Sequence, residues 1–151
     1  MTVNTFEVAK SILNEVRANA PATFSGLGLI FYNPPLSLPV ITLGYESLFL
    51  PPLPIVGADV IAQILARISV AESPWHDGFH LIDAQSVEMT HVSQFFSPPL
   101  EAAHYSVSDP PIGARHMAAM LGSTLPTVDV TALLTKRGDL ILFKNGALLA
   151  G

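Results

Sequence analysis

Hydrophobic positions near the start of the chain recur with the period of an α-helix. The apolar stripe has members three or four residues apart: Val8, Ile12, Leu13 and Val16. Asn4, with Glu7 three residues later, is a helix-start signal, because the two side chains can satisfy unpaired backbone N–H groups reciprocally. Pro21 disfavours the helical conformation at Ala20. We therefore predict a first helix between Asn4 and Ala20.

Two further segments have helical patterns. The first has a stripe of apolar residues: Val60, Ile61, Ile64, Leu65 and Ile68. Asp59 is expected to cap this helix, and Ser73-Pro74 to close it. The second segment, Ala114–Leu121, contains good helix formers and no breaker.

Short apolar runs rich in β-forming residues predict five strands: Gly26–Tyr32, Phe79–Ile82, Val87–Val92, Val128–Leu134 and Leu140–Phe143. The last two pair as a hairpin, with Lys136-Arg137-Gly138-Asp139 interpreted as its turn. Asn145-Gly146 is a further turn signal. Helices and strands alternate at the front of the chain, and strands pair at its end. We predict a single α/β domain over residues 1–151, with a mixed central β-sheet flanked by helices.

The segment Asn33–Pro54 breaks these patterns. Six prolines each remove a backbone donor: Pro34, Pro35, Pro39, Pro51, Pro52 and Pro54. At most a short strand, Val40–Leu43, fits between them. The segment is also apolar, with Leu48 and Phe49 among its residues. We expect it to lie against the domain surface or to form a patch that a partner covers.

Composition narrows the class of protein. The chain has 151 residues, of which 50% are hydrophobic and 13% charged, and no cysteine. This length suits one domain with a sizeable core, and the composition excludes a mainly disordered chain. The missing cysteines exclude disulfide and cysteine–zinc scaffolds. Seven Lys and Arg residues against twelve Asp and Glu residues give a net charge of −5, so we expect no nucleic-acid partner.

The sequence also lacks the marks of a membrane or secreted protein. It has no run of roughly 18 or more apolar residues, so no membrane span is predicted. The N-terminus carries Asn4 and Glu7 and no basic start, unlike a secretory signal. We therefore expect a cytoplasmic location. The mean hydropathy of +0.47 is high for such a chain, so we expect a partner to cover some apolar surface.

The densest polar cluster spans residues 75–80, Trp-His-Asp-Gly-Phe-His, between a predicted helix and a predicted strand. Ligand sites of α/β folds lie between such elements, and Gly78 after Asp77 lets a ligand approach the backbone closely. The alternative is a plain Asp-Gly turn that enters the strand. His76 and His80 are not expected to share a metal, because residues four apart on a strand lie more than about 10 Å apart.

A second cluster opens the predicted helix at residue 114. Arg115 and His116 follow Gly113 there, where free N–H groups and the helix dipole favour an anion. An arginine can bind phosphate oxygens with two hydrogen bonds. The alternative is that Arg115 pairs with a surface acid and His116 lies under the sheet. Ser123 could contact phosphate or simply end the helix.

The two clusters, in this order, resemble the motifs of the diadenylate cyclase domain family, also called the DisA N-terminal-like domain. That family has Asp-Gly-Ala at the start of a strand, where this chain has Asp77-Gly78-Phe79. It then has Gly-Thr-Arg-His-Arg-Ala-Ala at the start of a helix, where residues 113–119 read Gly-Ala-Arg-His-Met-Ala-Ala. The resemblance extends over most of the chain, from about the first helix to the end.

The resemblance implies a nucleotide site and a homodimer or higher homo-oligomer. In the family, two domains face each other and each holds one ATP. The 3′-hydroxyl of each nucleotide attacks the α-phosphate of the other, pyrophosphate leaves, and cyclic di-AMP forms. Asp77 would help to hold Mg²⁺ or Mn²⁺ and to activate the hydroxyl. The expected nucleotide-binding residues are Gly78, Phe79, Gly113, Arg115, His116 and Ser123. A regulatory partner domain would be compatible with this role.

Departures from the family pattern keep other functions open. Phe79 replaces a small alanine, Ala114 replaces a threonine, and Met117 replaces an arginine. The family's Val-Ser-Glu-Glu has become Leu-Leu-Thr-Lys at residues 133–136. Loss of a charged phosphate contact costs roughly 2–4 kcal/mol of transition-state stabilisation. The alternatives to a divergent cyclase are a catalytically degenerate nucleotide-binding sensor and a structural or interaction module.

Overall fold

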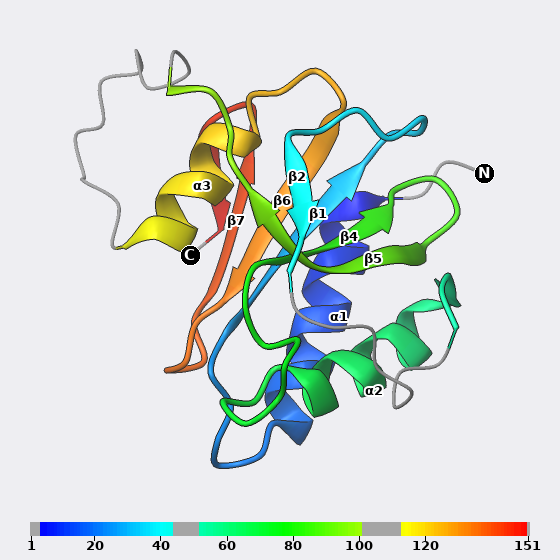
Figure 1. Ribbon diagram of the computed structural model, residues 1–151, viewed down its shortest axis with the longest axis vertical. Coiled ribbons are helices and arrows are strands. Elements are labelled where there is room, and N and C mark those ends of the chain that lie inside the picture. Colours follow the sequence, from blue (N-terminus) through cyan, green and yellow to red (C-terminus); the bar gives the residue numbers. More distant parts are fainter. Residues whose placement is uncertain (1–3, 44–51, 101–112, 151) are drawn as a thin grey trace.

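The described residues form a mixed eight-stranded sheet with helices on both faces (Figure 1). The computed structural model describes residues 4–43, 52–100 and 113–150. The elements in chain order are α1 (Thr5–Asn19), β1 (Leu27–Tyr32), β2 (Val40–Thr42), β3 (Ile55–Val56), α2 (Ala58–Ile68), β4 (Phe79–Asp83), β5 (Glu88–Phe96), α3 (Ala114–Gly122), β6 (Val128–Leu134), β7 (Leu140–Lys144) and β8 (Ala147–Ala150). The predicted fold class, a mixed sheet flanked by helices, is confirmed.

The strands follow the order β2-β5-β4-β1-β6-β7-β8, and β3 also pairs with β5. Strand β1 runs parallel to β4 and antiparallel to β6. The other pairs among the described strands are antiparallel. Because β1 and β4 are parallel, the chain must cross over between them, and α2 lies within that crossover.

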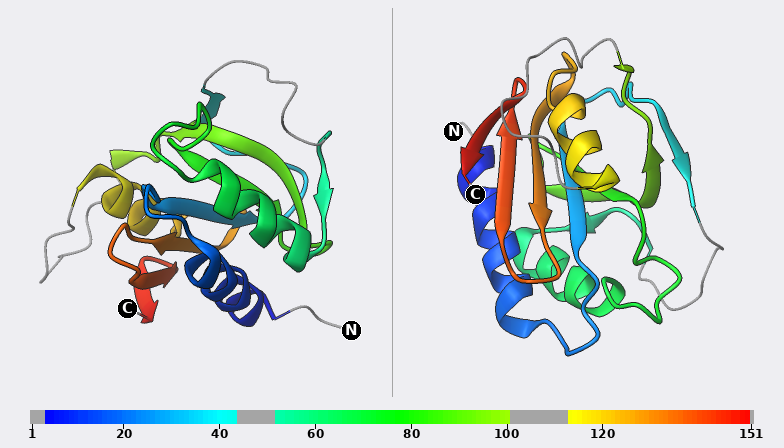
Figure 2. Two further views of the ribbon diagram at one scale, coloured as in Figure 1. Left: turned by 90° about the horizontal axis from the view of Figure 1, so that it is seen from below. Right: turned by 90° about the vertical axis from the view of Figure 1, so that its left-hand side faces the viewer.

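Strand β1 is buried along its whole length, as its continuous apolar run predicts. Alternate side chains enter two separate cores. Leu27, Leu29 and Phe31 face the core that contains α1 and α2. Ile30 and Tyr32 belong to the core beneath α3. Figure 2 shows α1 and α2 on one side of the sheet and α3 on the other.

The first helix forms as predicted, but the second differs at both ends. The Asn4 side chain accepts a hydrogen bond from the Glu7 N–H at 3.1 Å. Helix α2 begins at Ala58 with Gly57 as its N-cap, so Asp59 lies in the first turn and does not cap the helix. The helix ends at Ile68, five residues before Ser73. The chain turns away there because the Ser69 carbonyl accepts from the Ser25 N–H at 2.9 Å.

The proline-rich segment contributes one short strand at the sheet edge, as expected. Strand β2 pairs with β5, and residues 44–51, including Leu48 and Phe49, lie outside the described residues. The strands β3 and β8 were not predicted. In the described part of the chain, no helix combines the length and the apolar character needed to cross a membrane.

Candidate functional site

Strand register brings three chain segments together at one end of the sheet. Gly28 pairs with Phe79 across the parallel β1–β4 ladder. Leu27 pairs with Leu134 across the antiparallel β1–β6 ladder. The starts of β1 and β4 and the end of β6 therefore meet. The Asp-Gly cluster that precedes β4 lies at the same end as the hairpin turn between β6 and β7.

The loop that carries Asp77 is held against strand β5. The Ser93 hydroxyl donates to the Asp77 carbonyl at 3.0 Å, and the Asp77 carboxylate accepts from the Gly78 N–H at 2.9 Å. Gly78 has φ +78°, and a Cβ there would lie 2.5 Å from the Gln94 carbonyl oxygen. Only glycine fits this position, because it tolerates both the left-handed backbone and the close approach.

A β-bulge in β5 provides that support. Phe79 pairs with Gln94 and Leu81 with His91, so two residues of β5 face the single residue His80. One of them, Ser93, has φ +52°, and its N–H donates to Nδ1 of His80 at 3.0 Å. His80 thus helps to fix the bulge at Ser93, and the Ser93 hydroxyl in turn holds the Asp77 carbonyl.

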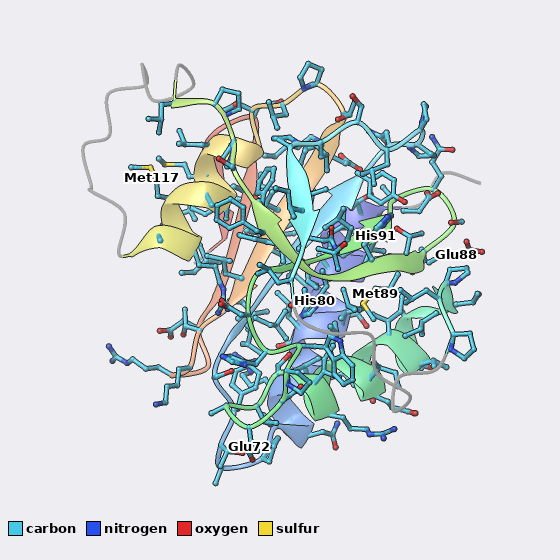
Figure 3. All side chains as sticks on the ribbon, in the orientation of Figure 1. Glu72, His80, Glu88, Met89, His91 and Met117 are labelled. Atoms are coloured by element: carbon cyan, nitrogen blue, oxygen red, sulfur yellow. The ribbon has the colours of Figure 1, made fainter. Side chains whose placement is uncertain are left out.

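His80 is fully buried in the centre of the domain (Figure 3). Since its Nδ1 accepts a hydrogen bond, its Nε2 carries the proton in the neutral ring. Within the described residues, this Nε2 has no hydrogen-bond partner. Burial, and secondarily the charge of Arg115, lower the pKa of His80 from 6.5 to about 3. The imidazole is therefore neutral at physiological pH.

Arg115 joins the two sequence clusters. It lies in the first turn of α3, whose N-cap Gly113 supplies no side-chain hydrogen bond. Its guanidinium lies 3.9 Å from the Asp77 carboxylate and donates to the His76 carbonyl at 3.4 Å. The Arg115 side chain is 29% exposed and that of Asp77 73%. Burial lowers the pKa of Arg115 and the charge of Asp77 opposes this effect, yet an arginine stays protonated in proteins.

A cavity of about 320 Å³ opens beside Arg115, between α3 and the β6–β7 hairpin. Its apolar lining comes from β1, β6 and β7: Leu27, Leu133, Leu134 and Ile141. Its polar and charged lining comes mainly from α3 and the hairpin: Ser25, Arg115, His116, Thr135, Lys136, Arg137 and Asp139. An apolar floor with cationic groups at the rim fits a ligand that has an aromatic and an anionic part.

The structure separates the expected site residues into two groups. Arg115 and His116 line the cavity, and Asp77 contacts Arg115 from the loop before β4. Phe79 is buried, with its ring edge-on to Phe96 at 5.5 Å between centroids, and does not line the cavity. Ser123 lies at the other end of α3. Nucleotide contacts by Phe79 and Ser123 stay predictions.

The other contacts of these residues are structural. The Ser123 hydroxyl donates to the Met120 carbonyl at 2.7 Å and accepts from the Gly146 N–H at 2.8 Å. It thereby ties the end of α3 to the β7–β8 turn. The His116 ring lies 5.4 Å from that of Phe143, measured between centroids. This contact places the His116 ring against β7, as the second interpretation expects, whereas phosphate binding by His116 stays a prediction.

Sequence reasoning missed two parts of this site. It treated Lys136 and Arg137 as ordinary turn residues, although they line the cavity. The available signal was the scarcity of cations, because two of only seven Lys and Arg residues are adjacent here. It also missed His80 as the partner of the Ser93 backbone, since a bulge has no sequence signature in this strand.

The residues beside Arg115 fit a divalent cation poorly. Mg²⁺ and Mn²⁺ prefer several oxygen ligands, commonly one or two carboxylates together with phosphates of the substrate. Asp77 is the one carboxylate that contacts Arg115 in the described residues, and the guanidinium already faces it. No group of three or more His, Cys, Asp or Glu side chains gathers as a metal site in residues 4–43, 52–100 and 113–150.

The fit of Gly78 generates a stability prediction. Gly78→Ala should lower the free energy of unfolding by more than the roughly 1–3 kcal/mol of left-handed strain alone, because the new Cβ also meets the Gln94 backbone. Gly57→Ala is the matched control: Gly57 has φ +96° but open space where the Cβ would be. Urea denaturation of both variants measures the difference. Equal losses would contradict the proposed contact with β5.

His80 generates a pH prediction. Below pH 6.5 the unfolded His80 binds a proton, which the folded side chain resists down to about pH 3. The unfolded state then holds more protons, so stability falls as the pH falls through this window. His80→Gln, whose amide oxygen can still accept from Ser93, should remove about 2 kcal/mol of the stability change between about pH 7 and about pH 5. Urea titrations at both pH values measure the free energy of unfolding. An equal loss of stability in the native protein and the variant would contradict the prediction.

Comparisons with known proteins support the fold. No family model matches the sequence, and no curated protein matches it either. Among solved structures, the chain is similar to a hypothetical membrane spanning protein from Bacillus cereus, with a TM-score of 0.65, 16% identity, and coverage of 98% of this chain and 63% of that one. It thus spans less than two thirds of that protein.

A second similar structure is a double mutant of DacA from Staphylococcus aureus, a diadenylate cyclase. The TM-score is 0.60 at 16% identity, with 95% of this chain and 85% of that chain covered. A sequence identity of 16% with a similar structure establishes a similar fold only, so the function has to be inferred from the residues of the site. The chain has a fold similar to that of a diadenylate cyclase.

Proposed function

We propose that this chain is a nucleotide-binding domain that takes ATP in the cavity between α3 and the β6–β7 hairpin. The observation that carries the proposal is the combination of an apolar floor with cationic side chains from two separate elements. Arg115 comes from α3 and Lys136 from the hairpin, and both line one cavity of about 320 Å³. That volume lies within the range of small-molecule sites, about 300–1,000 Å³.

Each part of the nucleotide has a matching part of the cavity. The base and ribose suit the apolar side chains of Leu27, Leu133 and Ile141. The phosphates suit Arg115 and the free N–H groups at the start of α3, where the N-cap Gly113 supplies no competing side chain. The choice of adenine rests on the resemblance of the fold to a diadenylate cyclase.

Binding without turnover, as in a sensor, is the form of this function that the site favours. Asp77 faces a guanidinium at 3.9 Å, and the described residues gather no group of three or more His, Cys, Asp or Glu side chains that could hold a metal. A second candidate is cyclisation of two ATP molecules across a pair of facing copies. The observation in its favour is the 73% exposure of the Asp77 side chain, which leaves the carboxylate open to a nucleotide held by another copy.

Removal of the Arg115 charge tests nucleotide binding. Arg115→Gln should weaken ATP binding by about thirtyfold, since a hydrogen bond between charged groups contributes about 2 kcal/mol. Isothermal titration calorimetry measures this effect. Arg67→Gln, an exposed position on α2, is the control and should leave affinity unchanged. The native chain failing to bind ATP, or the two variants binding equally, would refute the proposal.

Product analysis separates the two candidates. Pure protein is incubated with ATP, and separately with GTP, in Mg²⁺ and in Mn²⁺, and products are read by mass spectrometry. We expect ATP to bind without formation of a cyclic dinucleotide. A cyclic dinucleotide that disappears in Asp77→Asn would establish the cyclase instead. The substitution keeps the side-chain shape and removes the charge that faces Arg115.

A further inference from the structure

The turn between β6 and β7 stands between two cavities. Lys136, Arg137 and Leu134 line both the cavity described above and a second one of about 270 Å³. The second cavity lies on the side of α1 and is also lined by Arg17 and Phe24. The turn therefore presents its cations to solvent-accessible space on both sides.

This end of the molecule gathers most of its positive charge. Four of the seven Lys and Arg residues line the two cavities: Arg17, Arg115, Lys136 and Arg137. Within the described residues, the ion pairs are Arg115 with Asp77 and Lys144 with Asp129. Neither Lys136 nor Arg137 has a carboxylate partner in this part of the chain. In a chain of net charge −5, these two cations thus lie beside one cavity without an ion pair among the described residues.

The turn itself is held in place by hydrogen bonds. The Thr135 N–H donates to the Asp139 carbonyl at 2.9 Å, and the Asp139 N–H donates to the Thr135 hydroxyl at 3.0 Å. The Arg17 guanidinium donates to the Gly138 carbonyl at 3.1 Å. Lys136 and Arg137 therefore project from a fixed backbone, which reduces the entropy lost when they bind a ligand.

We infer that Lys136 and Arg137, together with Arg115, neutralise the polyphosphate of the bound nucleotide, so that ATP binds as the free anion and not as a complex with a divalent metal. This inference rests on the proposed function. In many nucleotide sites Mg²⁺ bridges the phosphates and one or two protein carboxylates. Here three cations line the cavity, and Asp139 is its one carboxylate among the described residues. The Asp139 backbone helps to close the turn.

The test is a calorimetric titration with ATP, once in excess EDTA and once in excess Mg²⁺. ATP should bind in EDTA at least as tightly as in Mg²⁺, because the magnesium complex presents less negative charge to the same cations. The joint replacement Lys136→Gln and Arg137→Gln should weaken binding in EDTA by about tenfold or more. Both side chains are exposed, so the fold should persist, which circular dichroism checks. Arg67→Gln, outside both cavities, should leave affinity unchanged.

Two further measurements sharpen this test. Inorganic tripolyphosphate, which lacks base and ribose, should displace ATP in EDTA from the native chain and fail to do so from the double variant. Lys136→Glu places a carboxylate beside the cavity. In EDTA, Lys136→Glu should bind ATP more weakly than Lys136→Gln does. Addition of Mg²⁺ should raise the affinity of Lys136→Glu for ATP.

The outcomes distinguish the two proposals. ATP binding that requires Mg²⁺, or a double variant that binds as tightly as the native chain, overturns this inference and leaves nucleotide binding in place. A native chain that binds ATP in neither buffer overturns the proposed function, and this inference with it.

Discussion

The site depends on the register of β1 between β4 and β6. All six residues of β1 are buried, and their side chains alternate between two cores. A slip of one residue would bring a side chain to the place of Gly28, where a Cβ would lie 2.7 Å from the Phe79 ring, so close packing specifies the register. The same register sets the loop of Asp77 and the hairpin after Leu134 beside the start of β1. Burial of an apolar strand thus determines where polar side chains from distant parts of the sequence meet.

The structure at the end of the sheet that carries the loop of Asp77 has a local cost in folding free energy. The Nε2 of His80 is buried without a partner in the described residues, which costs roughly 1–3 kcal/mol. Ser93 has φ +52°, a strained conformation for a residue with a side chain. Such strain persists only where surrounding structure determines it, and it concentrates at functional positions. The hydroxyl of the strained Ser93 donates to the Asp77 carbonyl, so the strain helps to fix the position of the loop that carries Asp77.

The hydrophobic periodicity of the sequence predicts most of the helices and strands. The features that it misses depend on contacts between residues that lie far apart in the sequence. The stripe of α1 and the unbroken apolar run of β1 identify both elements, because burial imposes their spacing directly. The end of α2 depends on the Ser69 bond to Ser25, which lies far away in sequence. Asp77 and Arg115 were identified by motif. Lys136 and Arg137 were not, since basic residues are common in hairpin turns and the cavity arises from strand pairing.

The grouping of cations at one end has a consequence beyond the bound state. The two neighbouring cavities are lined by four cations, Arg17, Arg115, Lys136 and Arg137, and by one carboxylate, Asp139, whereas the whole chain has a net charge of −5. The positive lining attracts an approaching anion before contact, over a distance that salt shortens.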